Sequence, residues 1–365
     1  MNSPFFRWII PAFLLFFAVN SAAKSSAPFS VIAYYTGDSQ LIGQYDTGKL
    51  THIIFSFCHL KDGRLNVASA RDTATIHHLV SLKKINPGLK IMLSLGGWGG
   101  CAPCSETFAT EAGIVKFARS VKELNDYFGS DGLDLDWEYP TIPGYPGHLY
   151  QPADRTNFTS LVKALRKELG SNNELSFAAG GFQRFLDESV EWLEIMPLLD
   201  RVNIMSYDLV SGYATVTGHH TPLFSTRPGE QSADLAVNYL LHLGIPASKL
   251  VIGAAFYTRI WKEVSATNNG LYQAGEHTHG VNFRNYDSQL TPEKGWTYYW
   301  DNKAKAPWWY NVAEKKFATG DDLRSAKEKT AYAKKKKLGG IMFWELTLDK
   351  SAGGLLDAIH EEAVK

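Results

Sequence analysis

Three carboxylates stand at alternate positions in one short apolar segment of the chain. Residues 131–140 read DGLDLDWEYP, so that Asp134, Asp136 and Glu138 are spaced two residues apart. Because side chains of a strand alternate between its two faces, these three share one face, and Asp131 falls on the other. Carboxyl groups this close cannot all ionise freely, so at least one should titrate high. A raised carboxyl pKa is what a general acid needs near neutral pH, and the segment therefore predicts acid–base chemistry.

A metal site and an acidic strand without chemistry are the two alternatives for this segment. Metal ions prefer ligands that converge from several loops, and an acidic strand without function would bury unpaired carboxylates at high cost. The pair Cys101-x-x-Cys104 lacks a second Cys or His pair at zinc-ligand spacing. The sequence therefore predicts no metal and no cofactor. In an oxidising compartment Cys101 and Cys104 could instead form a local disulfide.

The carboxylate segment is one of a series of short apolar runs that alternate with amphipathic stretches. The runs are rich in Val, Ile, Leu and Phe without clean alternation, as parallel strands covered on both faces are. The runs lie at 31–35, 52–57, 90–95, 132–137, 175–179, 201–206, 250–254 and 340–344, and the predicted helices at 73–85, 114–128, 155–169 and 233–243. Eight strands with intervening helices predict an α/β fold, a (β/α)8 TIM barrel, whose active sites form at the C-terminal strand ends. A doubly wound open sheet is the alternative, but residues 35–38 are not the phosphate-binding glycine turn that it would need.

One interval is too long for a simple barrel. Strand seven ends near Ala255, yet the next predicted helix is at 322–337. A structureless loop of that length is uncommon in a compact domain, and the interval is dense in Trp and Tyr. The sequence therefore predicts a small α+β insertion domain at 256–319, between strand seven and the last helices, on the C-terminal, active face. The barrel itself would comprise 29–255 and 320–365.

Composition and the first residues bound the class of protein. The chain is 45% hydrophobic and has a formal net charge of zero, which excludes intrinsic disorder and argues against a nucleic-acid partner. Residues 1–23 resemble a signal peptide, with Arg7, an apolar stretch at 8–19 and small residues at 21–23. That stretch is too short to span a bilayer, and an uncleaved N-terminal anchor is the alternative. We expect a monomer, secreted or periplasmic, that does not contact a membrane after cleavage.

The carboxylate segment resembles the signature of family 18 glycoside hydrolases, the chitinases. Other segments resemble motifs of that family in the order that it requires, on the third, sixth, seventh and eighth strands, at 94–98, 205–208, 256–259 and 342–345. The interval after strand seven resembles the α+β insertion domain of the subfamily with deep clefts. Together these resemblances cover essentially the whole mature chain.

The resemblance implies retaining, substrate-assisted hydrolysis of β-1,4 bonds between N-acetylglucosamine units. Glu138 would protonate the glycosidic oxygen while the N-acetyl carbonyl of the sugar attacks the anomeric carbon. Asp136 would accept a hydrogen bond from the acetamido N–H, and Asp134 would share a proton with Asp136. Tyr207 would hold the acetamido group in line for attack. Asp131 would give structural support unless a bulge turns it.

The resemblance also implies a row of substrate contacts at strand ends. Trp344 would form the floor of the cleft, although a core tryptophan is the alternative, and Trp98 would stack on a sugar beyond the cleavage point. For Phe57 and Met205 packing in the core explains the residue nearly as well as a contact. The other implied contacts are Tyr34, Asp208, Tyr257 and Arg259.

Two rival functions stay open beside a chitinase acting on chitin or chito-oligosaccharides. A chitin-binding lectin on an inactive barrel would resemble this family but lack the acid, whereas Glu138 is present. A related hydrolase would cut between the core sugars of N-glycans or within a bacterial wall glycan. The large insertion favours a long polymer cleft over those substrates. Endo or exo action, processivity and direction do not follow from the sequence.

Overall fold

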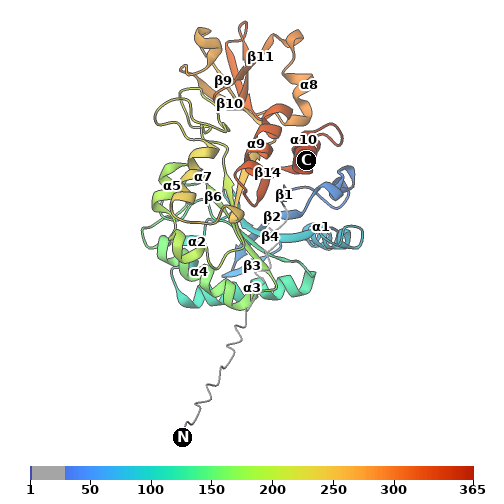
Figure 1. Ribbon diagram of the computed structural model, residues 1–365, viewed down its shortest axis with the longest axis vertical. Helices are drawn as coiled ribbons and strands as arrows, with labels where there is room; N and C mark the ends of the chain where they lie inside the picture. Colours follow the sequence, from blue (N-terminus) through green and yellow to red (C-terminus); the bar gives the residue numbers. More distant parts are fainter. Residues whose placement is uncertain (2–28) are drawn as a thin grey trace.

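The barrel predicted from the sequence is confirmed by the computed structural model, which describes Met1 and residues 29–365 (Figure 1). Within residues 29–365, eight parallel strands close into a ring in the order β1-β14-β8-β7-β6-β5-β4-β2, with β2 paired to β1. These strands are β1 (Ser30–Tyr35), β2 (His52–Lys61), β4 (Lys90–Gly96), β5 (Gly132–Asp136), β6 (Glu174–Gly180), β7 (Arg201–Met205), β8 (Leu250–Ala255) and β14 (Gly340–Trp344). The predicted signal peptide, apart from Met1, lies outside the described residues. No helix of residues 29–365 is long and apolar enough to cross a membrane.

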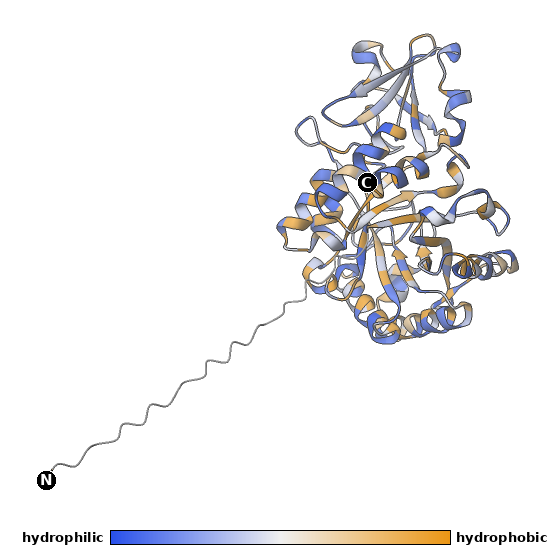
Figure 2. Ribbon diagram, turned by 45° about the vertical axis from the view of Figure 1, so that its right-hand side comes forward, coloured by the Kyte–Doolittle hydropathy of each residue, from blue (hydrophilic) through white to orange (hydrophobic). Residues whose placement is uncertain are grey.

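Alternation along each strand divides the barrel side chains into an outer and an inner set. On β5, Leu133 and Leu135 belong to the large core between strands and helices, whereas Asp134 and Asp136 lie on the inner face. Apolar residues dominate the strands in Figure 2, and hydrophilic residues lie on the outer helices. The inner set includes a second, smaller apolar cluster of Ile32, Tyr34, Ile54, Met92, Ala178, Met205, Tyr207, Val251, Ala255 and Met342.

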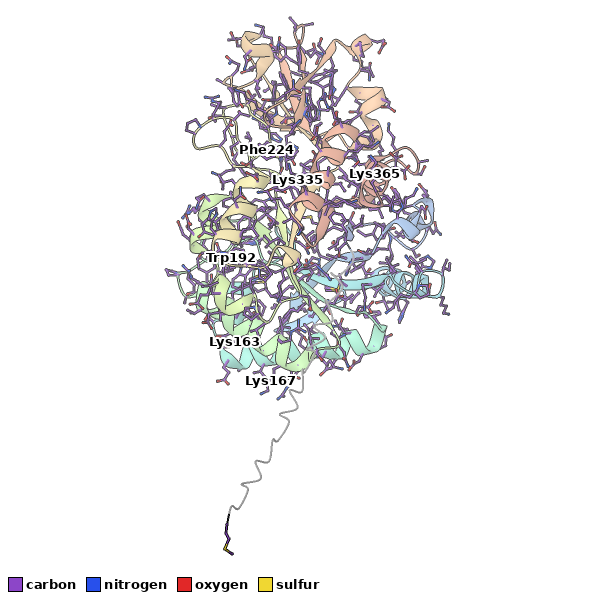
Figure 3. All side chains as sticks on the ribbon, viewed as in Figure 1. Lys163, Lys167, Trp192, Phe224, Lys335 and Lys365 are labelled. Carbon is purple, nitrogen blue, oxygen red and sulfur yellow. A yellow bond between two sulfur atoms is a disulfide. The ribbon has the colours of Figure 1, made fainter. Side chains whose placement is uncertain are left out.

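Helices cover the outside of the barrel, each burying one face. They are α1 (Ala70–Ser81), α2 (Cys104–Phe108), α3 (Glu111–Phe128), α4 (Asp154–Leu169), α5 (Gln183–Glu188), α6 (Trp192–Ile195), α7 (Ala233–His242), α9 (Leu323–Lys335) and α10 (Leu355–Ala363). On α4, Leu161 and Leu165 are buried while Lys163 and Lys167 are exposed, and both lysines lie on the outer side of the molecule in Figure 3. This amphipathic period is the pattern that predicts the helices.

The start of α1 differs from the prediction by three residues. The helix begins at Ala70 rather than at residue 73, because the Ser69 side chain accepts a hydrogen bond from the backbone N–H of Asp72 and caps the helix. It ends at Ser81, and a 3-10 turn, Leu82–Lys84, continues the predicted segment. Caps and turns of this kind act on one or two residues and leave the apolar period unchanged.

The interval after β8 contains a second sheet. Within residues 258–320, five antiparallel strands follow the order β10-β9-β13-β12-β11. They are β9 (Thr258–Lys262), β10 (Glu276–His279), β11 (Trp296–Asp301), β12 (Ala306–Asn311) and β13 (Lys316–Gly320), and the short helix α8 (Tyr286–Gln289) lies between β10 and β11 in the chain. The short strand β3 (Arg64–Asn66) lies outside this sheet and pairs antiparallel with β2. This sheet has its own apolar cluster, which includes Trp261, Trp308 and Phe317, and it lies beyond the barrel at the top of Figure 1. That residues 256–319 form a separate insertion domain remains a proposal, and this sheet supports it.

Candidate active site

Asp134 is the innermost of the three aligned carboxylates and is fully buried. Its oxygens accept hydrogen bonds from side chains on four other strands or strand ends, because the barrel brings those strands around β5. The donors are Ser176 Oγ at 2.6 Å, Tyr34 Oη at 2.9 Å, Asn203 Nδ2 at 3.1 Å and Ser94 Oγ at 3.2 Å. Burial raises the pKa of Asp134, and these hydrogen bonds act in the opposite direction. The four donors satisfy the oxygens of Asp134 inside the barrel and partly offset the effect of burial on its pKa.

Asp136 lies one step nearer the strand end and is held differently. Its Oδ1 atom is buried and has no hydrogen-bond partner among the described residues. The pKa of Asp136 is raised well above its usual range, first by burial, then by the charge of Glu138 and that of Asp134. In the described part of the chain no hydrogen bond joins Asp134 to Asp136, so the shared proton stays a prediction. Asp136 thus offers a buried oxygen without a hydrogen-bond partner, to which a substrate N–H could donate.

Glu138 follows the end of β5 and is partly exposed at the mouth of the barrel. Burial of its carboxyl raises the pKa of Glu138 to about 7, a hydrogen bond from Tyr139 lowers it, and the nearby charge of Asp208 raises it. A carboxyl with a pKa near 7 is protonated for much of the time at neutral pH and can act as a general acid. Asp134, Asp136 and Glu138 therefore lie in three different environments, and only the outermost of them, Glu138, is partly exposed to a ligand.

Tyr207 and Asp208 follow β7, which is two strands from β5 around the barrel. Tyr207 is buried, and its pKa is raised by burial and then by the charges of Asp136 and Glu138, so its hydroxyl stays protonated beside them. Asp208 forms an ion pair with Arg259, whose Nη2 lies 2.6 Å from Oδ2, and also faces His220 Nδ1 at 3.4 Å. Despite burial, hydrogen bonds from His220 and Arg259 hold the pKa of Asp208 below its usual range. Asp208 is therefore a fixed negative charge that bridges β7 and β9.

Aromatic side chains surround the mouth at the ends of β1, β2 and β14. The Trp344 ring stacks on Phe57 with centroids 5.5 Å apart and an interplanar angle of 17°, and its centroid lies 5.8 Å from that of Tyr34. Trp344 is only partly buried, so one part of the indole is available at the mouth. Met205 is buried within the inner apolar cluster, where packing accounts for it. Tyr257 packs beside that cluster, and its centroid lies 6.4 Å from that of Tyr207.

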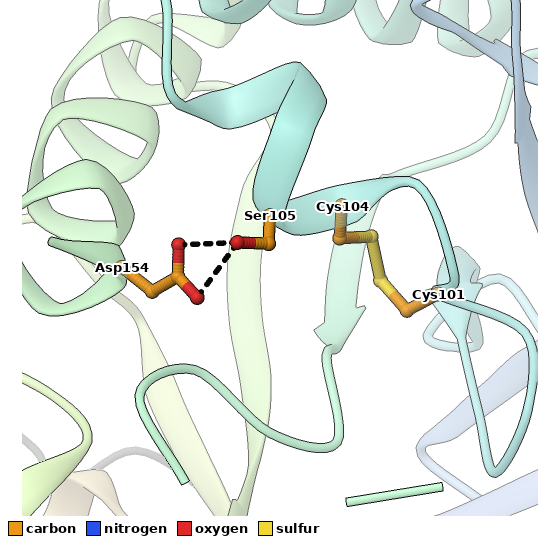
Figure 4. The surroundings of a disulfide bond; sticks show 4 residues. All are labelled: Cys101, Cys104, Ser105 and Asp154. Atoms are coloured by element: carbon orange, nitrogen blue, oxygen red, sulfur yellow. Dashed lines mark hydrogen bonds between the residues drawn. A yellow bond between two sulfur atoms is a disulfide. The ribbon is translucent and has the colours of Figure 1, made fainter. Parts of the chain in front are cut away.

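Trp98 is separate from that group and exposes 48% of its surface. It lies in the loop between β4 and α2, where Cys101 and Cys104 are joined by a disulfide bond (Figure 4). Its centroid is 6.5 Å from that of Tyr139 and 5.7 Å from that of Tyr145. The structure therefore places Trp98 near Tyr139, the residue after Glu138, within a second aromatic group.

Asp131 lies just before β5, at the opposite end of the strand from Glu138. Its carboxylate accepts hydrogen bonds from Lys83 Nζ at 2.8 Å and from the backbone N–H of Ile91 at 2.8 Å. These contacts join β5 to β4 and to the turn after α1. They support the structural role expected from its strand parity.

Sequence reasoning missed a buried ion pair that links the catalytic strand ends. Lys329 Nζ lies 2.7 Å from Asp321 Oδ2, and both side chains are 0% exposed. Asp321 Oδ2 also accepts the backbone N–H of Ala255 at 2.9 Å, while Lys329 donates to Thr221. Thr221 in turn donates to the carbonyl of Ser206, which precedes Tyr207, at 3.1 Å. A lysine on the buried face of a predicted helix is the signal that could have shown this pair.

Two exposed aromatics near the mouth were also missed. Tyr145 exposes 41% of its surface in the loop after β5, and Tyr213 exposes 70% in the loop after β7. Both follow a glycine in loops whose course the sequence does not give. Aromatic residues in loops that follow barrel strands are the signal in the sequence. Only the fold shows that these loops lie on the same face of the barrel as Glu138.

Comparisons with known proteins agree with this geometry. Residues 30–349 match the family model of glycosyl hydrolases family 18. The chain is 30% identical to Chitinase A1 of Niallia circulans over 94% of its length but spans only 59% of that protein, and 32% identical to Chitotriosidase-1 of Mus musculus, covering 84% of this chain and 69% of that one. A family 18 N-acetylglucosaminidase structure from Paenibacillus barengoltzii superposes with a TM-score of 0.83 at 35% identity, covering 92% of this chain and 99% of that one. The chain therefore belongs to family 18 of the glycosyl hydrolases.

Proposed function

We propose that the protein is a secreted chitinase that hydrolyses β-1,4 bonds between N-acetylglucosamine units by substrate-assisted, retaining catalysis. One observation carries the proposal: Glu138, with a pKa of about 7, stands at the mouth beside the buried, unsatisfied oxygen of Asp136. A general acid adjacent to an acceptor for an amide N–H fits a sugar whose N-acetyl group takes part in the reaction. A monomer, exported with its leader removed, is the form in which we expect it to act.

In the first step Glu138 donates its proton to the glycosidic oxygen as the bond from that oxygen to the anomeric carbon breaks. The acetamido carbonyl oxygen forms the new bond to the anomeric carbon and gives an oxazolinium ion. In the second step Glu138 takes a proton from water as the water oxygen bonds to the anomeric carbon, on the face that the leaving group had occupied. The bond from the anomeric carbon to the acetamido oxygen breaks and the acetamide is restored, so configuration is retained. One carboxyl thus acts as acid and then as base.

Asp136 and Asp134 would support the charge that appears on the acetamido nitrogen. The free oxygen of Asp136 accepts the acetamido N–H, and the ionised form of Asp136 becomes favoured as that positive charge grows. Asp134, held in place by four donors, would share a proton with Asp136 and so take up the change in charge behind it. Tyr207 would donate to the acetamido oxygen and keep it in line with the anomeric carbon.

The remaining strand-end residues would hold the sugar chain. Trp344, backed by Phe57 and Tyr34, offers a flat surface below the carboxylates, and pyranose rings present C–H groups to such surfaces. The Asp208–Arg259 pair would supply charged hydrogen-bonding groups to hydroxyl or acetamido groups on the side of β7. Met205 and Tyr257 would bound the pocket by packing.

The pKa of Glu138 predicts a pH profile with a definite sign. The acid must carry its proton, so kcat/KM for a chito-oligosaccharide should be level below about pH 7 and fall roughly tenfold per unit above it. In Asp208→Asn the midpoint should move to lower pH, because the charge of Asp208 raises the pKa of Glu138. Initial rates between pH 4 and 9 would measure both midpoints. A profile that stays level to pH 9, or a midpoint unmoved in the variant, would contradict the assignment.

The substrate is tested by offering alternatives side by side. Colloidal chitin, chitohexaose and a high-mannose glycopeptide would be incubated with the protein, and products identified by mass spectrometry. Oligosaccharides released from chitin, with the glycopeptide unchanged, would support the proposal. Cleavage of the glycopeptide alone would establish the N-glycan hydrolase instead. Binding of chitin without any product would establish the lectin.

The same products distinguish a chitinase from an N-acetylglucosaminidase, the activity named for the structural relative from Paenibacillus barengoltzii. Release of monosaccharide alone from chitohexaose at early times would favour that second activity. Disaccharides or longer products would favour chitinase. The carboxylate geometry is compatible with both activities, and only the ends of the cleft distinguish them.

A further inference from the structure

A row of aromatic side chains leads away from the proposed acid. Tyr139 directly follows Glu138 in the chain, and its ring lies 6.5 Å from that of Trp98. The Trp98 ring centroid lies 5.7 Å from that of Tyr145, and the Tyr145 centroid lies 4.9 Å from that of His148. Tyr139 is partly buried, whereas Trp98 and Tyr145 expose 48% and 41% of their surfaces. The row therefore begins at the reacting centre and ends at solvent.

Tyr145 is held in this row by the backbone before it. A Cβ at Gly144 would lie 2.0 Å from the carbonyl oxygen of Glu138, so the loop after β5 folds back onto the residue that carries the acid. The Tyr145 ring also packs on Gly99, where a Cβ would come within 3.1 Å of the ring and φ is +87°. At Gly144 any side chain would collide with the backbone, and at Gly99 the positive φ favours glycine. Both glycines therefore favour the observed position of Tyr145 beside Glu138 and Trp98.

The two loops that carry Trp98 and Tyr145 are also tied to one another. Ser105 Oγ donates to Asp154 Oδ1 at 2.9 Å, both residues are fully buried, and the disulfide lies one residue away (Figure 4). Asp154 accepts the backbone N–H of Gln151 at 2.9 Å, and Gln151 Nε2 reaches Ser105 Oγ at 3.0 Å. These contacts join the first turn of α2 to the first residue of α4 and to Gln151, so the ends of the two loops are held together. A support of this kind removes the ordering cost that a mobile binding loop would add.

The Trp98 and Tyr145 rings meet at an interplanar angle of 69°, edge to face. Both rings stay partly exposed although each contacts other aromatic rings. Exposed apolar surface that is gathered in one place marks a binding site, whereas the same surface scattered singly does not. The two rings form a corner with an apolar wall on each of two sides.

We propose that Tyr145 is a sugar-binding residue and that, with Trp98, it forms an aromatic corner that binds one N-acetylglucosamine ring beyond the cleavage point. This inference rests on the proposed function, which supplies the class of ligand. Trp98 provides one wall, and Tyr145 adds a second that limits the rotation of the ring. The corner raises affinity for chains long enough to reach it and takes no part in the bond-breaking step.

The test measures binding of chitohexaose by calorimetry in the Glu138→Gln background, so that no substrate is consumed. Tyr145→Ala should weaken binding about three- to tenfold, as expected for the loss of one aromatic wall. Tyr145→Phe keeps the ring and should stay within about twofold of the parent. Tyr127→Ala is the matched control, because Tyr127 is 65% exposed on α3 and packs on Phe128 at 4.8 Å. An unchanged affinity in Tyr145→Ala, or an equal loss in Tyr127→Ala, would overturn the proposal.

A double variant tests whether the two rings hold the same sugar. Residues that share one ligand group are coupled, so Trp98→Ala with Tyr145→Ala should lose less affinity than the product of the two single losses. Losses that multiply fully would place the rings on different sugars and overturn the corner. In the chain with Glu138 intact, Tyr145→Ala should raise KM for chitohexaose and leave kcat within about twofold. If the parent neither binds nor cleaves chitohexaose, the proposed function itself fails; if it does both and Tyr145→Ala is unchanged, only this inference fails.

Discussion

Replacement of Glu138 by Gln is expected to reduce kcat on chito-oligosaccharides about 10²- to 10⁴-fold, the range associated with loss of a general acid. The amide keeps the size of the side chain and its hydrogen bond with Tyr139 but has no proton to give near pH 7. Because Asp134, Asp136 and Tyr207 are unchanged, binding of chitohexaose should stay within a few fold of the parent. Initial rates and calorimetry on the same preparations would measure both quantities.

The control for this variant is Glu106→Gln, a carboxyl in the first turn of α2 that lies outside the carboxylate row. Its kcat should match that of the parent. Full activity in Glu138→Gln would refute the assignment of the acid. A parallel loss of binding and of kcat would indicate instead that the substitution had disturbed the site as a whole.

Replacement of Lys329 by Met is expected to lower the free energy of unfolding by about 3–5 kcal/mol, because removal of one partner leaves a buried charge without compensation. Lys329 and Asp321 are both fully buried, 2.7 Å apart. Burial lowers the pKa of Lys329, and the charge of Asp321 and its hydrogen bond act in the opposite direction. Urea denaturation followed by fluorescence would give the change. Activity should fall with stability only where the unfolded fraction becomes significant.

Two further variants make this second result specific. Lys122→Met removes an exposed ion pair with Asp126 on α3 and should change stability much less. Asp321→Asn in the Lys329→Met background should recover part of the loss, since the uncompensated charge is removed while the hydrogen bond from Ala255 is kept. Equal losses for the lysines at 122 and 329, or no recovery in the double variant, would show that the buried pair is not a major source of stability.

The barrel could be predicted because its strands obey a simple physical rule. Parallel strands covered on both faces are apolar along their length, so β4, β6 and β8 stand out from the polar sequence around them. The same rule makes the β5 carboxylates conspicuous, because Asp134 and Asp136 interrupt an otherwise apolar strand. Alternation then gives their shared face without any knowledge of the other strands. These are local properties, and local properties are what one sequence reports.

What could not be predicted depends on contacts between distant parts of the chain. The four donors to Asp134 come from β1, β4, β6 and β7, and no pattern in the sequence pairs them with it. Lys329 has the spacing of a helix residue and shows its partner only once α9 is folded beside Asp321. Tyr145 lies in a loop whose path depends on the close approach of Gly144 to Glu138. In each case the fold, through long-range packing, decides what the residue does.

The acid and the aromatic corner are carried by different kinds of structure, and this has an evolutionary consequence. Glu138 directly follows a strand that is hydrogen-bonded on both sides, whereas Trp98 and Tyr145 belong to loops. The disulfide closes the segment after Trp98, and the Ser105–Asp154 contact joins the helices that follow the two loops. Changes in those loops can alter which chain lengths are preferred while the carboxylates stay where they are. Descendants of this chain could therefore diverge in substrate length by exchanging one pair of loops, with the reaction itself inherited intact.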